Sequence, residues 1–182
     1  MKRRLCSVMT SAALCLIPLA SASDPAPPPA PAARLPHPHF PKTLVCEIPK
    51  GPTITVKHLT VTFDRDGAAK MAPGTSWHLA GATFETDSDL VVGGRDVAAG
   101  RYALSARKLE GGWQLALHRG KGFSRPGPDA LLLDTDFVAD SLMFDHLNCD
   151  IQPGGNKQHT QLFLDVRFDK MLARCLIELP KK

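Results

Sequence analysis

Residues 101–119, RYALSARKLEGGWQLALHR, alternate apolar and polar side chains on both sides of the turn sequence Glu110-Gly111-Gly112. This alternation is typical of two antiparallel strands joined by a tight turn. One face of the predicted hairpin is apolar and packs into a core; it carries Tyr102, Leu104, Ala106, Trp113, Leu115 and Leu117. We expect the opposite face to meet solvent; it carries Arg101, Ser105, Arg107, Gln114 and His118.

The same two-residue period recurs on both sides of the hairpin, and almost no stretch has the 3.6-residue period of a helix. The predicted strands are residues 43–48, 53–63, 83–92, 101–108, 113–119, 143–151, 160–168 and 172–179. In the second strand the apolar phase slips, which predicts a β-bulge near Lys57-His58 or two shorter strands. About eight short strands without a βαβ rhythm predict an all-β fold, a single antiparallel β-sandwich or jelly-roll-like domain over residues 42–182.

Residues 1–22 have the pattern of a secretory signal peptide. Lys2, Arg3 and Arg4 precede an apolar run, and Ala20-Ser21-Ala22 has the small-x-small pattern at which a signal peptidase cleaves. The apolar run is too short and too interrupted for a membrane span. Residues 23–41 are rich in Pro and Ala, which is typical of an extended spacer. We therefore expect a periplasmic or secreted protein with no membrane span after cleavage.

The charge of the mature chain argues against a nucleic-acid partner. The full sequence has a formal net charge of +4. Removal of the signal peptide leaves 19 basic and 18 acidic residues, a net charge of +1. The Lys and Arg residues are also interspersed with Asp and Glu, whereas a polyanion-binding protein gathers them on one face.

Three cysteines, Cys46, Cys149 and Cys175, remain after cleavage, because Cys6 and Cys15 belong to the signal peptide. Each is in phase with apolar neighbours, so we expect all three to face inward. Two interpretations stay open: three small buried hydrophobic residues, or one disulfide with a free thiol. A reactive thiolate needs a partly exposed, electropositive setting, which an inward position does not provide.

Several segments resemble a family of exported bacterial proteins. PGTSWHLAGAT at residues 73–83 is followed by DLVVGG at 89–94, VAAGRYAL at 97–104 and GWQLAL at 112–117. Their order and spacing resemble the Trp-containing block, the following strand, the Gly-x-Tyr turn and the hairpin partner of domain-of-unknown-function family 2911. FDHL at 144–147 and LDV at 164–166 are similar to its closing strands, so the resemblance covers residues 53–179. It implies no established activity.

The chain departs from the family pattern at polar positions. Where the family has Trp-Arg followed by Gly-Ala-Asn, this sequence has Trp77-His78 and then Gly81-Ala82-Thr83, with one additional residue between them. A polar site that relatives build from this block would be lost or rebuilt here. The aromatic and glycine residues that match are explained by a core and by tight turns.

Candidate functional residues must come from polar side chains that the alternation places outward. The sequence has no triad, metal-binding or phosphate-binding motif, so we predict no catalytic, cofactor-binding or metal-binding residue. His146, Asn148 and Asp150 share one face of a strand. Side chains two apart are separated by about 6–7 Å and those four apart by about 13 Å, so His146 and Asp150 could not hold one ion without help from another strand. Together with His78 and His118, the three residues make up the polar face on which we expect any site.

Two functions from different classes fit these observations. The first is a non-catalytic exported module that binds a ligand or an envelope partner, or has a structural role, through its outer face or loops. The second is an envelope hydrolase whose site is assembled across strands from His78, His118, His146 and nearby carboxylates. Convergence of two of these histidines with a carboxylate in a concave pocket would favour the hydrolase.

The signal-peptide pattern predicts a mature N-terminus at Ser23, because cleavage follows Ala22. Mass spectrometry of the N-terminus of the exported protein measures this directly. A mature chain that keeps residues 1–22, or a lipid on Cys15, would contradict the prediction.

Overall fold

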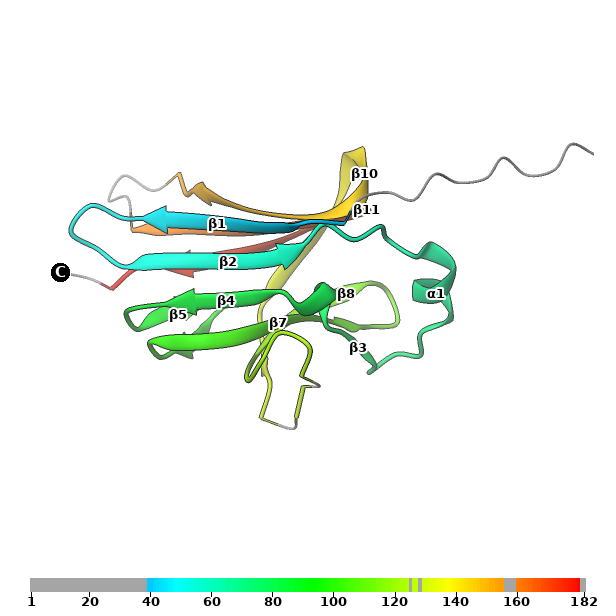
Figure 1. The fold of residues 1–182 in the computed structure, drawn as a ribbon, viewed down its shortest axis with the longest axis horizontal. Helices are drawn as coiled ribbons and strands as arrows, with labels where there is room; N and C mark the ends of the chain where they lie inside the picture. Colours follow the sequence, from blue (N-terminus) through cyan, green and yellow to red (C-terminus); the bar gives the residue numbers. More distant parts are fainter. Residues whose placement is uncertain (1–38, 125, 128, 156–159, 181–182) are drawn as a thin grey trace, which may run out of the picture. The chain divides into compact units, whose positions relative to one another are not determined.

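The computed structural model describes residues 39–124, 126–127, 129–155 and 160–180, which belong to a compact unit running from Pro36 to Lys182. The predicted signal peptide and most of the predicted spacer lie outside the described residues. The described part is an antiparallel β-sandwich in which two sheets pack together (Figure 1). The all-β sandwich predicted from the sequence is confirmed.

The larger sheet has seven strands in the order β1-β2-β4-β7-β8-β9, with β3 paired to β7. These strands are β1 (Pro41–Glu47), β2 (Thr53–Leu59), β3 (Ser76–Trp77), β4 (Thr83–Thr86), β7 (Gly100–Lys108), β8 (Trp113–Arg119) and β9 (Leu131–Leu132). The smaller sheet has four strands in the order β10-β11-β5-β6. Its strands are β10 (Thr135–Pro153), β11 (Gln161–Glu178), β5 (Leu90–Val92) and β6 (Arg95–Val97).

The hairpin of β7 and β8 lies inside the larger sheet and has the predicted inward face. Leu104 pairs with Leu117 and Ala106 pairs with Leu115, and all four side chains are fully buried. The apolar side chains that alternate along residues 101–119 therefore point into the core, which lies between the two sheets.

The opposite face of this hairpin, which the sequence pattern predicts to meet solvent, is partly covered: Arg101 is exposed, but other residues of this face are not. Ser105 and His118 are buried, and Gln114 is half-buried. The connection from β8 to β9 accounts for this: His118 Nε2 lies 3.0 Å from the carbonyl oxygen of Ser124, and Gln114 Nε2 donates to the carbonyl oxygen of Leu133. Alternation within a strand does not reveal that a later loop folds back over its polar face.

Of the two alternatives predicted for residues 53–63, the β-bulge at Lys57-His58 is wrong, whereas the segment does divide: β2 ends at Leu59 and Thr62 forms a separate β-bridge. The ladder between β1 and β2 runs without a register shift through both residues. The apolar pattern slips because a histidine, His58, occupies an inward-facing position that is 3% exposed. The sequence pattern therefore marked a buried polar residue, not an irregular strand.

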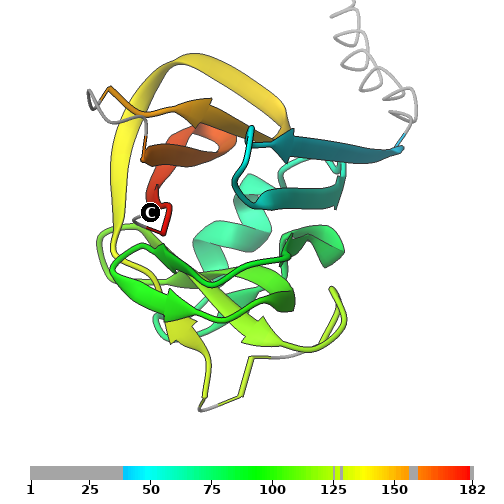
Figure 2. The ribbon, with the colours of Figure 1, turned by 90° about the vertical axis from the view of Figure 1, so that its left-hand side faces the viewer.

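Other strand boundaries also differ from the prediction. Residues 83–92 form two strands in different sheets, because a turn at Asp87-Ser88 carries the chain from β4 to β5; Thr86 Oγ1 donates to the carbonyl oxygen of Ser88 within this turn. The strand predicted at 143–151 is the second half of β10, which Figure 2 shows as one long, curved strand. The strands predicted at 160–168 and 172–179 are one strand, β11, with Asp169 at a φ of 55° between its halves.

A short helix, α1 (Arg65–Lys70), and a 3-10 turn, η1 (Leu79–Gly81), are not among the predicted elements. Asp64 precedes α1 and caps it, because its carboxylate accepts a hydrogen bond from the backbone N–H of Gly67. The helix has six residues, which is too few for a recognisable helical period, and Ala68 is its buried residue. α1 lies at one end of the sandwich (Figure 1).

The two sheets join along one edge, where Thr62 forms an isolated β-bridge with His146 of β10. The backbone N–H groups of Phe63 and Leu147 donate hydrogen bonds of 2.9 Å across this join. Strand β1 lies beside β10 at the same edge (Figures 1 and 2). We call this edge, where β1, β10 and the residues after β2 meet, the seam.

Trp113 should be the most costly side chain of the hairpin to remove. It is 2% exposed, and its ring centroid lies 5.9 Å from that of Phe168 and 6.2 Å from that of Trp77. We expect Trp113→Ala to lower the free energy of unfolding by about 3–5 kcal/mol in urea denaturation. The matched control is Gln114→Ala, which removes one hydrogen bond of 3.3 Å and should cost about 1 kcal/mol. Equal losses would contradict the orientation of β8.

Candidate ligand-binding groove

Ligand-sized hollows occur at the seam, at the free edge of the smaller sheet and beside α1. The hollow at the seam has a volume of about 660 Å³ and lies where β1, the end of β2 and β10 meet. Its lining includes Phe40, Lys42, Thr60, Met143, His146 and Asn148. We call it the seam groove.

Two large apolar side chains of the seam groove are exposed. Phe40 is 55% exposed and Met143 is 52% exposed. Phe40 is held in place by its backbone: its N–H donates to Thr60 Oγ1 at 3.1 Å, and its carbonyl oxygen accepts from the N–H of Thr60 at 3.0 Å. An anchored aromatic ring and a thioether in a concave site are typical of a surface that binds an apolar group.

Polar groups of the seam groove converge from β1 and β10. Lys42 Nζ donates to Asn148 Oδ1 at 2.8 Å, which joins the edges of the two sheets. The ring of His146 meets the ring of His39 edge to face, with 6.5 Å between the centroids. The groove thus combines one ammonium group, one carboxylate from Asp145, an amide and an imidazole with an apolar surface.

His58 is a neighbour of this groove that is not among the candidate residues predicted from the sequence. It pairs directly with Lys42 in the β1–β2 ladder, so both side chains project from the same face of the sheet, as does Thr60 two residues further along. His58 is 3% exposed, and neither ring nitrogen has a hydrogen-bond partner among the described residues. Burial, and then the charge of Lys42, lowers the pKa of His58 from 6.5 to about 4.

The structure brings together two of the five candidate residues named from the sequence. His146 and Asn148 line the seam groove. Asp150 lies further along β10, opposite Asp165, and its carboxylate accepts hydrogen bonds from the backbone N–H of Ile151 at 2.9 Å and from Gln152 Nε2 at 3.1 Å. Asp150 therefore has a local structural role in the sheet.

His78 and His118 both contact the loop at residues 120–124. The ring of His78 meets that of Phe123 edge to face, at 5.6 Å between centroids. His118 Nε2 lies 3.0 Å from the carbonyl oxygen and 3.1 Å from the hydroxyl oxygen of Ser124. A carbonyl oxygen only accepts, so Nε2 carries the hydrogen and is not free to take a proton from Ser124. The contact fastens the loop to the sheet.

The described residues contain no group of three His, Cys, Asp or Glu side chains that could hold a metal ion. His78 and His118 belong to the 120–124 loop region, whereas His146 belongs to the seam groove. The arrangement offers the hydrolase hypothesis no pocket lined by two of these histidines among the hollows at the seam, at the sheet edge and beside α1.

A buried carboxylate that is not among the candidate residues predicted from the sequence lies on β11. Asp165 is 0% exposed, and its oxygens accept three hydrogen bonds of 2.8 Å from Arg167 and Arg174. The hydrogen bond with Asp165 raises the pKa of Arg174. A charge buried with this many partners is a structural ion network, which fixes the two halves of β11 against each other.

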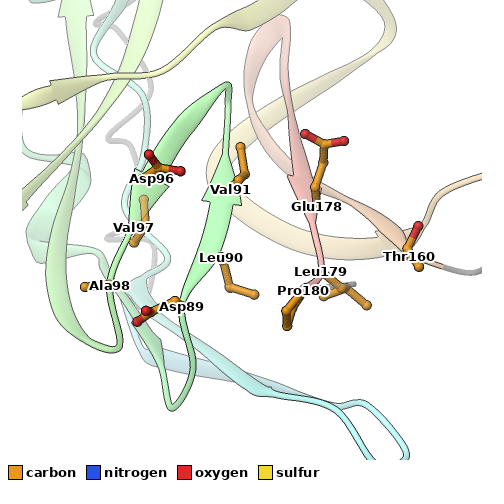
Figure 3. A pocket seen from close by; sticks show the side chains of 10 residues that line it. All are labelled: Asp89, Leu90, Val91, Asp96, Val97, Ala98, Thr160, Glu178, Leu179 and Pro180. Atoms are coloured by element: carbon orange, nitrogen blue, oxygen red, sulfur yellow. The ribbon is translucent and has the colours of Figure 1, made fainter. Parts of the chain in front are cut away.

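The hollow at the free edge of the smaller sheet is acidic. It has a volume of about 630 Å³, and carboxylates of Asp89, Asp96 and Glu178 surround apolar residues such as Val91 (Figure 3). All three acids are exposed, and Asp89 accepts a hydrogen bond from the backbone N–H of Ala99. Asp96 lies on the edge strand β6, where a charged side chain hinders pairing with another strand.

The three described cysteines are free thiols. Cys149 and Cys175 are buried and Cys46 is partly buried, which confirms the predicted inward phase. Burial raises the pKa of Cys149 to about 12 and also raises the pKa of Cys46. These thiols are therefore poor nucleophiles in the folded protein.

Comparisons with protein-family models, with curated proteins and with solved structures found no match to this chain. The resemblance to domain-of-unknown-function family 2911 stays a prediction from sequence motifs. In the described part of the chain, no helix has the length and apolar character that a membrane crossing needs.

The lowered pKa of His58 predicts a loss of stability in mild acid. The unfolded chain takes up a proton on this residue below about pH 6.5, whereas the folded chain takes it up only near pH 4. Stability is therefore lost as the pH falls from about 6.5 to about 4. Between about pH 7 and about pH 4.5 this amounts to about 2 kcal/mol.

The measurement is urea unfolding of the wild type and of His58→Leu at both pH values. The variant lacks the titrating group, so its stability should fall by about 2 kcal/mol less than that of the wild type over this interval. The difference between the two proteins removes the effect of the other titrating residues. An identical loss in both would show that His58 is not buried as a neutral ring.

Proposed function

We propose that the protein is an exported, non-catalytic binding module whose ligand occupies the seam groove. The single observation that carries this proposal is the groove itself, in which exposed Phe40 and Met143 lie beside the Lys42–Asn148 pair. Export is part of the proposal and rests on the signal-peptide pattern of residues 1–22.

The composition of the groove supports a binding role. A buried polar group without a partner lowers the stability of the folded protein by about 1–3 kcal/mol. A large apolar side chain that stays exposed does not contribute the free energy that its burial would provide. The seam groove, of about 660 Å³, contains the exposed apolar side chains, and the buried His58 pairs with its lining residue Lys42 in the β1–β2 ladder. A largely apolar hollow with a few converging polar groups and a residue of perturbed pKa is the usual form of a ligand site.

Lys42 favours an amphiphilic ligand with one anionic group that binds on the lysine side of the groove, away from the one carboxylate of the lining, that of Asp145. The lining contains one Lys or Arg residue, Lys42, and this residue is exposed. Asn148 and His146 lie beside it as further hydrogen-bonding groups. An anionic group near Lys42 would leave the apolar part of the ligand against Phe40 and Met143.

The envelope hydrolase has less support. Catalysis of that kind requires a base beside a nucleophile. In the seam groove the base would be His146 and the nucleophile the hydroxyl of Thr60. Thr60 is only 8% exposed, and its hydroxyl is hydrogen-bonded to the backbone of Phe40. His118 and Ser124 are close together, but the carbonyl oxygen at Nε2 fixes the wrong tautomer for proton transfer.

The probe 1-anilinonaphthalene-8-sulfonate tests the groove, because it is an aromatic anion whose fluorescence rises in an apolar site. We expect saturable binding to the native protein. Lys42→Met should weaken binding by up to about fivefold through the loss of an exposed charge, and Phe40→Ala should weaken it about tenfold through the loss of the apolar contact.

The matched control is Phe123→Ala. Phe123 is an equally large ring, 63% exposed, that lies on the 120–124 loop and not in the groove lining. Its replacement should change the affinity by less than about twofold, because no contact of the probe is lost. Unchanged affinity in both groove variants would remove the seam groove as the binding site.

A further inference from the structure

Both tryptophans of the chain line a second hollow, beside α1. Trp77 and Trp113 border this hollow together with Phe63, Met71 and Ala68. Its volume is about 350 Å³. We call it the aromatic pocket; it shares none of its lining residues with the seam groove.

The wall of the aromatic pocket is fixed by the core. Phe168 is fully buried, and three rings surround it: the centroid of Phe63 lies at 5.0 Å, that of Trp77 at 5.1 Å and that of Trp113 at 5.9 Å. Such tilted and edge-to-face pairs hold aromatic rings in defined orientations. The pocket therefore presents a preformed aromatic surface.

The side of the pocket that α1 forms is held in place more weakly than the aromatic wall. Ala68 is the buried residue of this helix, and it also lines the pocket. Arg65 pairs with Asp169 of β11 at 2.6 Å, and the arginine side chain is 53% exposed. Exposed ion pairs contribute about 0–1 kcal/mol, so this pair adds little to the attachment of α1.

We propose that the aromatic pocket binds a small, uncharged apolar molecule of one or two rings. An apolar cavity of about 150 Å³ already binds benzene, and this pocket is larger. The lining contains no Lys, Arg or His. Its one charged residue is Asp64, whose carboxylate already accepts the hydrogen bond that caps α1.

The absence of a cation from the lining separates this site from the seam groove. Lys108 Nζ lies over the ring of Trp113, 4.8 Å from its centroid, but Lys108 is not a lining residue. An anionic ligand would therefore lose its hydration and gain no ion pair. The expected ligands of the two sites differ in charge, so each site can be tested without the other.

The indole N–H resonances provide the test, because the chain has two tryptophans and both line the pocket. In a ¹⁵N-labelled sample titrated with toluene, we expect both resonances to shift saturably with one common dissociation constant. Benzoate and phenyltrimethylammonium keep the ring but add a negative or a positive charge. Each should bind at least about tenfold more weakly than toluene.

Two variants on α1 locate the site. Ala68→Phe places a ring in the pocket and should weaken toluene binding at least about tenfold. Ala69→Phe places the same ring on the exposed side of the same helix and should leave the affinity within about twofold. If Ala68→Phe does not fold, the comparison of the three ligands on the wild type still decides the proposal.

Three results would overturn the proposal. The first is the absence of saturable shifts with toluene. The second is benzoate or phenyltrimethylammonium binding as tightly as toluene, which would show that charge or cation–π attraction governs the site. The third is an equal affinity of both alanine variants for toluene. Loss of anilinonaphthalene sulfonate binding in Lys42→Met has no bearing on these measurements.

Discussion

The packing of three aromatic rings around Phe168 is the constraint on which one end of this sandwich depends. The rings come from Phe63, Trp77 and Trp113, which lie far apart in the sequence, and Phe168 itself belongs to the smaller sheet. The cluster therefore holds the two sheets together and fixes the chain between β2 and α1. Because the backbone of Phe63 also bonds across the seam, the same cluster determines where the seam groove lies.

His58 shows how the fold accommodates a local conflict near this seam. A buried imidazole without partners costs about 1–3 kcal/mol, which is a substantial part of the 5–15 kcal/mol by which domains are typically stable. An apolar side chain at this inward position would avoid that cost. The residue lies opposite Lys42, between the core at Val56 and the groove at Thr60. Conflicts of this kind are expected at functional sites, where recognition and not stability determines the residue.

Much of the framework could be predicted from the sequence, because alternation reports directly on which strand face is buried. The hairpin of β7 and β8, with Trp113 inward, and the shared face of His146 and Asn148 follow from that pattern. The rest depends on contacts between distant segments. The cover over His118 comes from a later loop, and Lys42 joins the site only because β1 lies beside β10. No periodicity within one strand contains that information.

Arg65 links the two hollows physically. Its guanidinium group pairs with Asp169 and also contacts the sulfur of Met143, which lines the seam groove, while its helix borders the aromatic pocket. A ligand that displaces α1 would therefore remove a contact of Met143, and a ligand that reorients Met143 would remove a contact of α1. Any effect of one site on the affinity of the other must be reciprocal and equal in free energy. The exposure of this ion pair limits the coupling to about 1 kcal/mol, so each site keeps most of its own affinity.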